Sequence, residues 1–147
     1  MRLDGSFRNR YDPFIPMSAL LFDFDGVLVD TFEMCYRISV IRTASLTPEG
    51  FRERFYGNVN TVLDTLPKPQ NWDFFALYAP ELMKLPVYPE MQALIQKLAQ
   101  QHTLFIVSST TSAPIKAFLA QHHLLDCFQE IYGNDIDKSK ERKIRLI

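Results

Sequence analysis

The stretch ALLFDFDGVLVDT, from Ala19 to Thr31, decides how the rest of this chain is interpreted. It opens with a short apolar run, which is the composition expected of a strand buried on both faces of a parallel sheet. Asp23 and Asp25 follow, and their side chains project to the same side if the chain is still extended there. Gly26 then allows a sharp turn. Crowded carboxylates repel one another, so the pattern predicts a cation site at the carboxyl end of this strand, where ligands bind in open α/β sheets.

The segment DFDGVLVDT, from Asp23 to Thr31, resembles the first signature of the haloacid dehalogenase-like hydrolases, Asp-x-Asp-Gly-(Thr/Val)-Leu-x-Asp-(Ser/Thr). The two aspartates, the glycine and Asp30 have the family's spacing, and an apolar strand precedes them. The chain is most similar in pattern to the phosphoglycolate-phosphatase-like members, which carry a small helical cap. The resemblance implies an α/β fold: a Rossmann-like parallel sheet in three α/β/α layers, with the cap inserted after the first strand.

Length and composition limit the classes of protein that this chain can represent. Its 147 residues allow one domain with a modest insertion, and a hydrophobic fraction of 47% is typical of a packed globular protein. The net charge of −1 offers no basic field, so we expect no nucleic-acid partner. No apolar run reaches the length of a membrane span, so we expect no membrane partner and a cytoplasmic location. Cys35 and Cys127 are too few for a disulfide framework or a zinc site.

Prolines, glycines and changes in apolar periodicity divide the chain further. Residues 1–16 have neither helical nor strand periodicity and are expected to form an irregular lead-in. A series of helices is expected next: from Thr31 to about Thr43, from Thr47, over 58–66 with a break at 67–69, and over 72–85, where Pro80 kinks or splits the helix. The resemblance assigns 32–85 to the helical cap, and 17–31 together with 86–147 to the α/β core.

A second apolar strand, residues 103–107, ends at a run of hydroxyl residues. This arrangement resembles the second signature of the family, which places Ser108 as a phosphate ligand with Ser109 beside it. Hydroxyls and backbone N–H groups at a strand-to-helix turn suit phosphate oxygens. A serine-rich loop that caps the next helix explains the same pattern equally well.

The family also requires a lysine at the start of a helix, whose ammonium neutralises the nucleophile and the incoming phosphate. Lys140 is the first choice, because Ser139 can cap a helix there and apolar residues follow at helical spacing. Lys138 is the second choice and Lys143 the third. The alternative is that this basic run is only a solvated helix face.

The resemblance implies a role for each of these residues. Asp23 is expected to be the nucleophile, forming an aspartyl-phosphate, and Asp25 the general acid and base. Mg²⁺ is expected to bind the Asp23 carboxylate and the Asp25 backbone carbonyl. Because dehalogenases of the family lack the second aspartate, the pattern favours hydrolysis of a small phosphorylated metabolite, a phosphomonoester. The residues expected to hold this substrate are Gly26, Ser108, Ser109, Lys138 and Lys140.

The family's fourth signature, a further strand whose acids complete the magnesium site, does not follow the lysine before Ile147. We therefore expect a member shortened at the C-terminus, slow or inactive, whose first strand lies at an exposed sheet edge that invites self-association. Two other functions remain open. One is a catalytically inactive remnant that binds phosphate or a partner chain, and the other is a phosphomutase.

Overall fold

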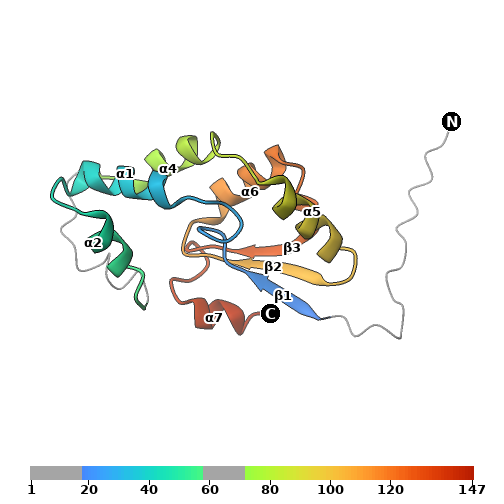
Figure 1. The fold of residues 1–147 in the computed structure, drawn as a ribbon. Coiled ribbons are helices and arrows are strands. Elements are labelled where there is room, and N and C mark those ends of the chain that lie inside the picture. The colour runs from blue at the N-terminus through green and yellow to red at the C-terminus, as the bar shows by residue number, and fades with distance from the viewer. Residues whose placement is uncertain (1–17, 58–71) are drawn as a thin grey trace.

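The computed structural model describes residues 18–57 and 72–147 and contains a parallel sheet flanked by helices (Figure 1). Three of the expectations fall on other residues: the lead-in over 1–16, the helix over 58–66 and its break at 67–69. These lie outside the described residues.

The sheet consists of three parallel strands in the order β1-β2-β3. They are β1 (Ala19–Phe22), β2 (Thr103–Val107) and β3 (Phe128–Tyr132). Leu20 pairs with Leu104, and Ile106 pairs with Ile131. Because the strands are parallel, their carboxyl ends meet at one edge of the sheet. Within the described residues β1 pairs only with β2, so the first strand lies at a sheet edge, as expected.

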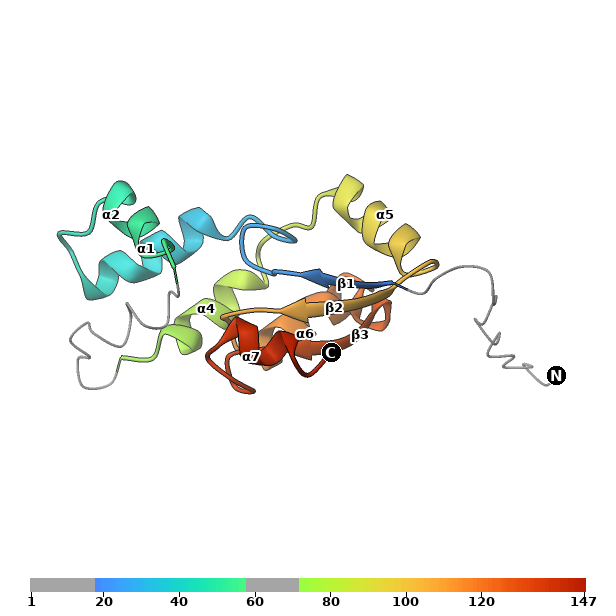
Figure 2. The same ribbon diagram turned by 90° about the horizontal axis from the view of Figure 1, so that it is seen from below.

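Helices on the two faces of the sheet complete the three layers predicted from the sequence. Figures 1 and 2 show α5 (Pro89–Leu98) and α6 (Ser112–Gln121) on one face and α7 (Lys140–Ile144) on the other. A short 3-10 helix, η1 (Leu125–Cys127), leads into β3. The core between β2 and α6 contains Ile106, Ile115 and Phe118, each fully buried. The α/β/α architecture is confirmed.

Three further helices lie beyond the carboxyl ends of the strands: α1 (Phe32–Arg42), α2 (Pro48–Glu53) and α4 (Phe74–Leu82) (Figure 1). Thr47 caps α2 by accepting a hydrogen bond from the Gly50 N–H, as its position predicts. Pro80 lies inside α4, which runs as one helix rather than two. The helix α4 packs against both α1 and α6. The division into a helical cap (32–85) and an α/β core (17–31 and 86–147) stays a prediction. No helix in the described part of the chain is long and apolar enough to cross a membrane.

The turn after β3 is packed tightly against the start of α6. The Ser112 hydroxyl accepts a hydrogen bond from the Gly133 N–H at 3.2 Å and donates one to Asp135 Oδ1 at 2.9 Å. The Ser112 N–H also donates to Asp135 Oδ1, at 2.6 Å. A Cβ atom at Gly133 would lie only 2.5 Å from the Ser112 backbone nitrogen. This close approach requires glycine.

Replacing Gly133 with alanine is therefore expected to destabilise the fold. The added methyl group would push Ser112 away from Asp135, and overpacking of this kind lowers the free energy of unfolding by roughly 1–3 kcal/mol. Denaturant unfolding followed by circular dichroism measures the change. The control is Gly50→Ala in α2, where the new Cβ would lie 3.3 Å from Thr47 Oγ1, so stability should change by less than about 1 kcal/mol. Equal stability of Gly133→Ala and the wild type would contradict the close contact.

Candidate active site

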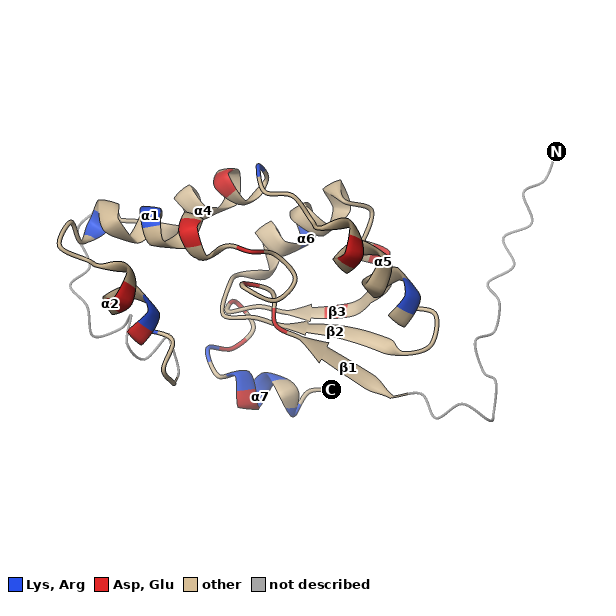
Figure 3. Ribbon diagram, in the orientation of Figure 1, with Lys and Arg blue, Asp and Glu red and all other residues tan. Residues whose placement is uncertain are grey.

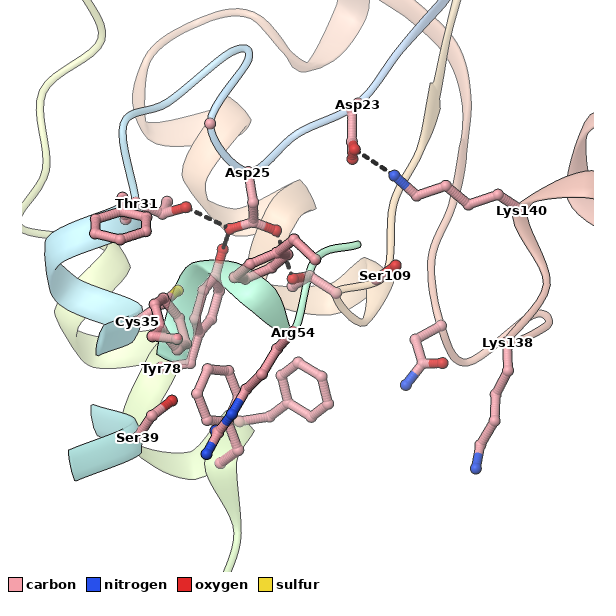
Figure 4. Close-up of a pocket in the computed structure, with 18 of the residues that line it drawn as sticks. Asp23, Asp25, Thr31, Cys35, Ser39, Arg54, Tyr78, Ser109, Lys138 and Lys140 are labelled. Atoms are coloured by element: carbon pink, nitrogen blue, oxygen red, sulfur yellow. Dashed lines mark hydrogen bonds and ion pairs between the residues drawn. The ribbon is translucent and has the colours of Figure 1, made fainter. Parts of the chain in front are cut away.

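A cavity of about 1120 Å³ opens at the carboxyl ends of the strands. It lies between the loops that follow β1 and β2 and the helices α1, α2 and α4 (Figure 4). Six of the seven residues selected from the sequence line it: Asp23, Asp25, Gly26, Ser109, Lys138 and Lys140. Thr110, which follows Ser109 in the loop after β2, lines it as well. Ser108 is not part of the wall.

Asp23 lies where β1 ends, and each of its carboxylate oxygens has a partner. Oδ1 accepts a hydrogen bond from the Phe24 N–H at 2.8 Å. Oδ2 forms an ion pair with Lys140 Nζ (Figure 4). The two side chains keep 36% and 42% of their surface exposed, so a ligand in the cavity can reach both. Ser139 caps the helix that carries Lys140, accepting a hydrogen bond from the Arg142 N–H at 3.3 Å.

Asp25 is held by three hydroxyl groups from three separate segments. Its Oδ1 accepts hydrogen bonds from Thr31 at 2.9 Å and from the Tyr78 hydroxyl at 2.7 Å. Its Oδ2 accepts one from Thr110 at 2.7 Å. Thr31 precedes α1, Tyr78 belongs to α4 and Thr110 follows β2, so this carboxylate joins the sheet to the helices beyond it. Fixed donors of this kind set the direction in which the carboxyl group points.

Gly26 makes the turn that brings these groups together. Its φ of 74° lies in the left-handed region that glycine adopts without strain. Its N–H donates to the Val29 carbonyl at 2.8 Å, which closes the turn after Asp25.

Ser108 is fully buried, and its hydroxyl accepts a hydrogen bond from the Thr110 N–H at 3.0 Å. In this arrangement the side chain shapes the loop, while Ser109 and Thr110 face the cavity. Its role as a phosphate ligand stays a prediction.

Lys143, the third choice for the phosphate lysine, is fully buried behind the same loop. Its ammonium donates to the Ser108 carbonyl at 2.5 Å and to the Gly133 carbonyl at 3.3 Å. Burial lowers the pKa of this ammonium, and the nearby charge of Lys140 lowers it further. Lys143 therefore links the end of β2 to the end of β3, while Lys138 and Lys140 line the cavity.

Sequence reasoning missed three residues of this site: the hydroxyls of Tyr78 and Thr110, and the contact that Thr31 makes. Tyr78 belongs to an aromatic-rich helix whose residues were expected to form core, and nothing in its spacing indicates that its hydroxyl reaches Asp25. Thr110 stands in a run of hydroxyl residues in which no one member is distinguished. Thr31 occupies the expected N-cap position, but its side chain does not cap the helix, because its hydroxyl bonds Asp25 instead.

Burial and the charge of Asp25 keep two neighbouring groups protonated. Burial raises the pKa of the Cys35 thiol to about 12, and the nearby Asp25 carboxylate contributes to the increase. Burial, followed by the charge of Asp25, also raises the pKa of Tyr78. The Tyr78 hydroxyl therefore keeps the proton that it donates to Asp25.

The raised pKa of Cys35 predicts a loss of stability at alkaline pH. The thiol of the unfolded chain ionises near the usual value of 9.0, whereas the folded thiol stays protonated up to about 12. Between these values the unfolded state loses a proton that the folded state retains, so the thiol lowers the free energy of unfolding by about 1.4 kcal/mol per pH unit as the pH rises.

Unfolding of Cys35→Ala should lack this contribution, whereas the half-buried Cys127→Ala should keep it. The measurement is the slope of the free energy of unfolding against pH, from urea titrations over about pH 9–11. A wild-type slope equal to that of Cys35→Ala would show that the folded thiol is not shielded.

We compared the chain with protein families, with curated protein sequences and with solved structures. Residues 20–144 match the family model for haloacid dehalogenase-like hydrolases. No curated protein sequence matches the chain. A haloacid dehalogenase-like family hydrolase from Streptococcus pneumoniae is 18% identical with a TM-score of 0.61, over 88% of this chain and 69% of that chain.

Two other solved structures show the same fold at low sequence identity. A mutant of CbbY from Rhodobacter sphaeroides, in complex with xylulose-(1,5)bisphosphate, is 18% identical with a TM-score of 0.65, over 89% of this chain and 71% of that chain. The L-2-haloacid dehalogenase from Xanthobacter autotrophicus, with chloropropionic acid covalently bound, is 14% identical with a TM-score of 0.56, over 89% and 65%. These likenesses concern the fold.

Proposed function

Because residues 20–144 match its model, this chain belongs to the haloacid dehalogenase-like hydrolases, and we propose that it is a phosphatase acting on a small phosphomonoester. The observation that carries the proposal is the Asp23–Lys140 ion pair at the wall of an open cavity, with Asp25 two residues away. A carboxylate beside an ammonium is a nucleophile that a phosphate dianion can approach, because the cation offsets the repulsion between the two anions.

The reaction proceeds in two displacements. In the first, a carboxylate oxygen of Asp23 forms a bond to phosphorus, the bond to the ester oxygen breaks, and Asp25 gives that oxygen its proton. This leaves an aspartyl-phosphate and the free alcohol. In the second, Asp25 takes a proton from water, which attacks phosphorus and releases inorganic phosphate and Asp23. The hydroxyls of Thr31, Tyr78 and Thr110 hold the Asp25 carboxyl group in place for both transfers.

The donor set of the site fits Mg²⁺, although with few protein ligands. The described residues contain no group of three or more His, Cys, Asp or Glu side chains that could hold a metal ion. The Asp23 carboxylate and the Asp25 backbone carbonyl would bind the ion, and water and phosphate oxygens suit the remaining positions, as is common for Mg²⁺. When bound, Mg²⁺ neutralises charge that develops on the phosphoryl oxygens. With a single carboxylate we expect weak metal binding and slow turnover.

The small ligand set also favours a second candidate function, a phosphate-binding module without turnover. The same Lys140 and loop N–H groups would serve it. A phosphate-binding module would bind inorganic phosphate but would release no phosphate from an ester. A phosphomutase, by contrast, would retain the phosphoryl group on Asp23 and pass it to a second substrate.

We also propose that the chain acts in the cytoplasm on a phosphorylated metabolite, without a nucleic-acid or membrane partner. The net charge of −1 supports the absence of a nucleic-acid partner.

Replacing Asp23 with asparagine should abolish phosphate release, because an amide cannot act as the nucleophile. The expected loss is roughly 10³-fold or more, measured as phosphate released from p-nitrophenyl phosphate with Mg²⁺ and again after chelation. The control is Asp30→Asn, the same change in the same loop, at a residue that lies outside the cavity wall and accepts the Phe32 N–H at 3.3 Å. It should retain activity within a few fold. Unchanged release by Asp23→Asn would exclude this nucleophile.

We also propose that two copies associate through the edge of β1. An edge strand presents unpaired backbone groups that can pair with another chain, and Leu21 of this strand is 40% exposed. Sedimentation velocity should show a concentration-dependent dimer that Leu21→Lys removes, since a charge opposes edge-to-edge pairing. The control, Ile136→Lys, changes an exposed residue that lies outside the strands and should leave the dimer intact. A wild-type monomer at all concentrations would overturn the proposal.

A further inference from the structure

The cavity has two walls of different chemistry. One wall carries the Asp23–Lys140 ion pair, and α7, the helix that begins with Lys140, is mostly charged. Figure 3 shows the contrast with α4, in which Glu81 is the only charged residue. The other wall is aromatic and includes Phe32 of α1, Phe51 and Phe55 in and just after α2, and Trp72, Phe74 and Phe75 at the start of α4. A ligand that is held by the ion pair and extends across the cavity therefore meets aromatic rings.

The aromatic wall reaches Asp25 through Tyr78. The Tyr78 hydroxyl donates to Asp25 Oδ1 at 2.7 Å. The rings of Phe74 and Phe75 lie 5.7 and 6.2 Å from the Tyr78 ring, centre to centre. In the proposed reaction Asp25 gives its proton to the ester oxygen, so that oxygen must come close to Asp25. The alcohol part of the substrate, which is bonded to this oxygen, would then lie beside the rings of α4.

Phe55 offers a further ring on the α2 side of the cavity. The buried Phe51 ring supports it in an edge-to-face contact, with 5.2 Å between the ring centres. Phe55 nevertheless keeps 50% of its surface exposed. Phe32 is less available to a ligand, because the Arg52 guanidinium lies over its ring at 4.9 Å from the centre. A large apolar side chain left open in a cavity beside charged groups is typical of a ligand site.

We propose that the alcohol part of the substrate carries an aromatic ring, which packs against Phe55 and against Phe74 and Phe75 of α4. This rests on the proposed function, since it names the substrate class of the same cavity. Ring pairs gain free energy beyond the burial of apolar area, because the negative face of one ring attracts the positive edge of another. An aliphatic group would gain from burial alone, so a preference for an aromatic over an aliphatic group of the same length is the mark of this site.

Three phosphomonoesters of primary alcohols test the site: 2-phenylethyl, 2-cyclohexylethyl and ethyl phosphate. The first two differ only in whether the ring is aromatic. Metal is chelated so that nothing is turned over. The fluorescence of Trp72, the only tryptophan of the chain, reports binding from within the cavity wall, and titration calorimetry checks each affinity. We expect the phenyl probe to bind the full chain about threefold to tenfold more tightly than the cyclohexyl probe, the range that one ring contact provides.

Variants at Phe55 test where the ring binds. Phe55→Leu keeps an apolar side chain but removes the ring, so it should reduce the preference for the phenyl probe to less than about twofold and leave the affinity for ethyl phosphate unchanged. Phe55→Tyr keeps the ring and should keep the preference. The matched control is Tyr56→Leu, the loss of a ring at the next residue, which is 81% exposed and lies outside the cavity wall. This variant should bind all three probes as the wild type does, and circular dichroism checks that each variant is folded.

Each outcome bears on the aromatic site separately from the phosphatase activity. Equal affinity of the phenyl and cyclohexyl probes for the wild type, or tighter binding of the cyclohexyl probe, overturns the proposal, because the cavity then selects only for apolar area. A preference that survives in Phe55→Leu, or that is lost in Tyr56→Leu, also overturns it. A preference that depends on Phe55 supports it. These results are read whether or not the chain releases phosphate from p-nitrophenyl phosphate, so failure of the aromatic site and failure of the proposed function are distinguishable.

Discussion

The contact between the Asp23 carboxylate and the Lys140 ammonium is the interaction around which the candidate site is arranged. The two residues are 117 positions apart in the chain, and the fold brings them together beyond the carboxyl ends of the parallel strands. Both side chains are partly exposed, so the pair contributes little to stability, in the range of about 0–1 kcal/mol for surface ion pairs. The fold must therefore hold these groups in place by other means.

Buried polar contacts behind the site provide that support. The Lys143 ammonium binds the carbonyls of Ser108 and Gly133, and so fixes the ends of β2 and β3 relative to the helix that carries Lys140. A buried cation is costly unless its hydrogen bonds are made, so this link disfavours other arrangements of the loops. Asp25 connects the sheet to the helices in the same way, through hydroxyls from three segments.

The features that depend on short stretches of the chain could be predicted from the sequence. Apolar runs marked the strands, and prolines and hydroxyl residues marked helix starts. The spacing of Asp23 and Asp25 pointed to residues that line the cavity of the candidate site. The sequence was insufficient where the outcome depends on packing between distant segments. The hydroxyl of Tyr78 reaches Asp25 across 53 positions, and the Lys143 ammonium bonds the Ser108 carbonyl across 35 positions; the periodicity of the sequence indicates neither contact. Aromatic residues of α4 look alike in sequence, whether they fill core or line a cavity.

The central claim is that Asp23 accepts a phosphoryl group beside Lys140, and a phosphoryl mimic tests it most directly. Beryllium trifluoride binds a carboxylate oxygen as a phosphoryl group would, and fluorine NMR reports it without turnover or knowledge of the substrate. We expect fluorine resonances of a bound trifluoride that require Mg²⁺, are lost in Asp23→Asn and are weakened in Lys140→Met. Absence of bound resonances in the wild type with Mg²⁺, or their persistence in Asp23→Asn, would contradict it.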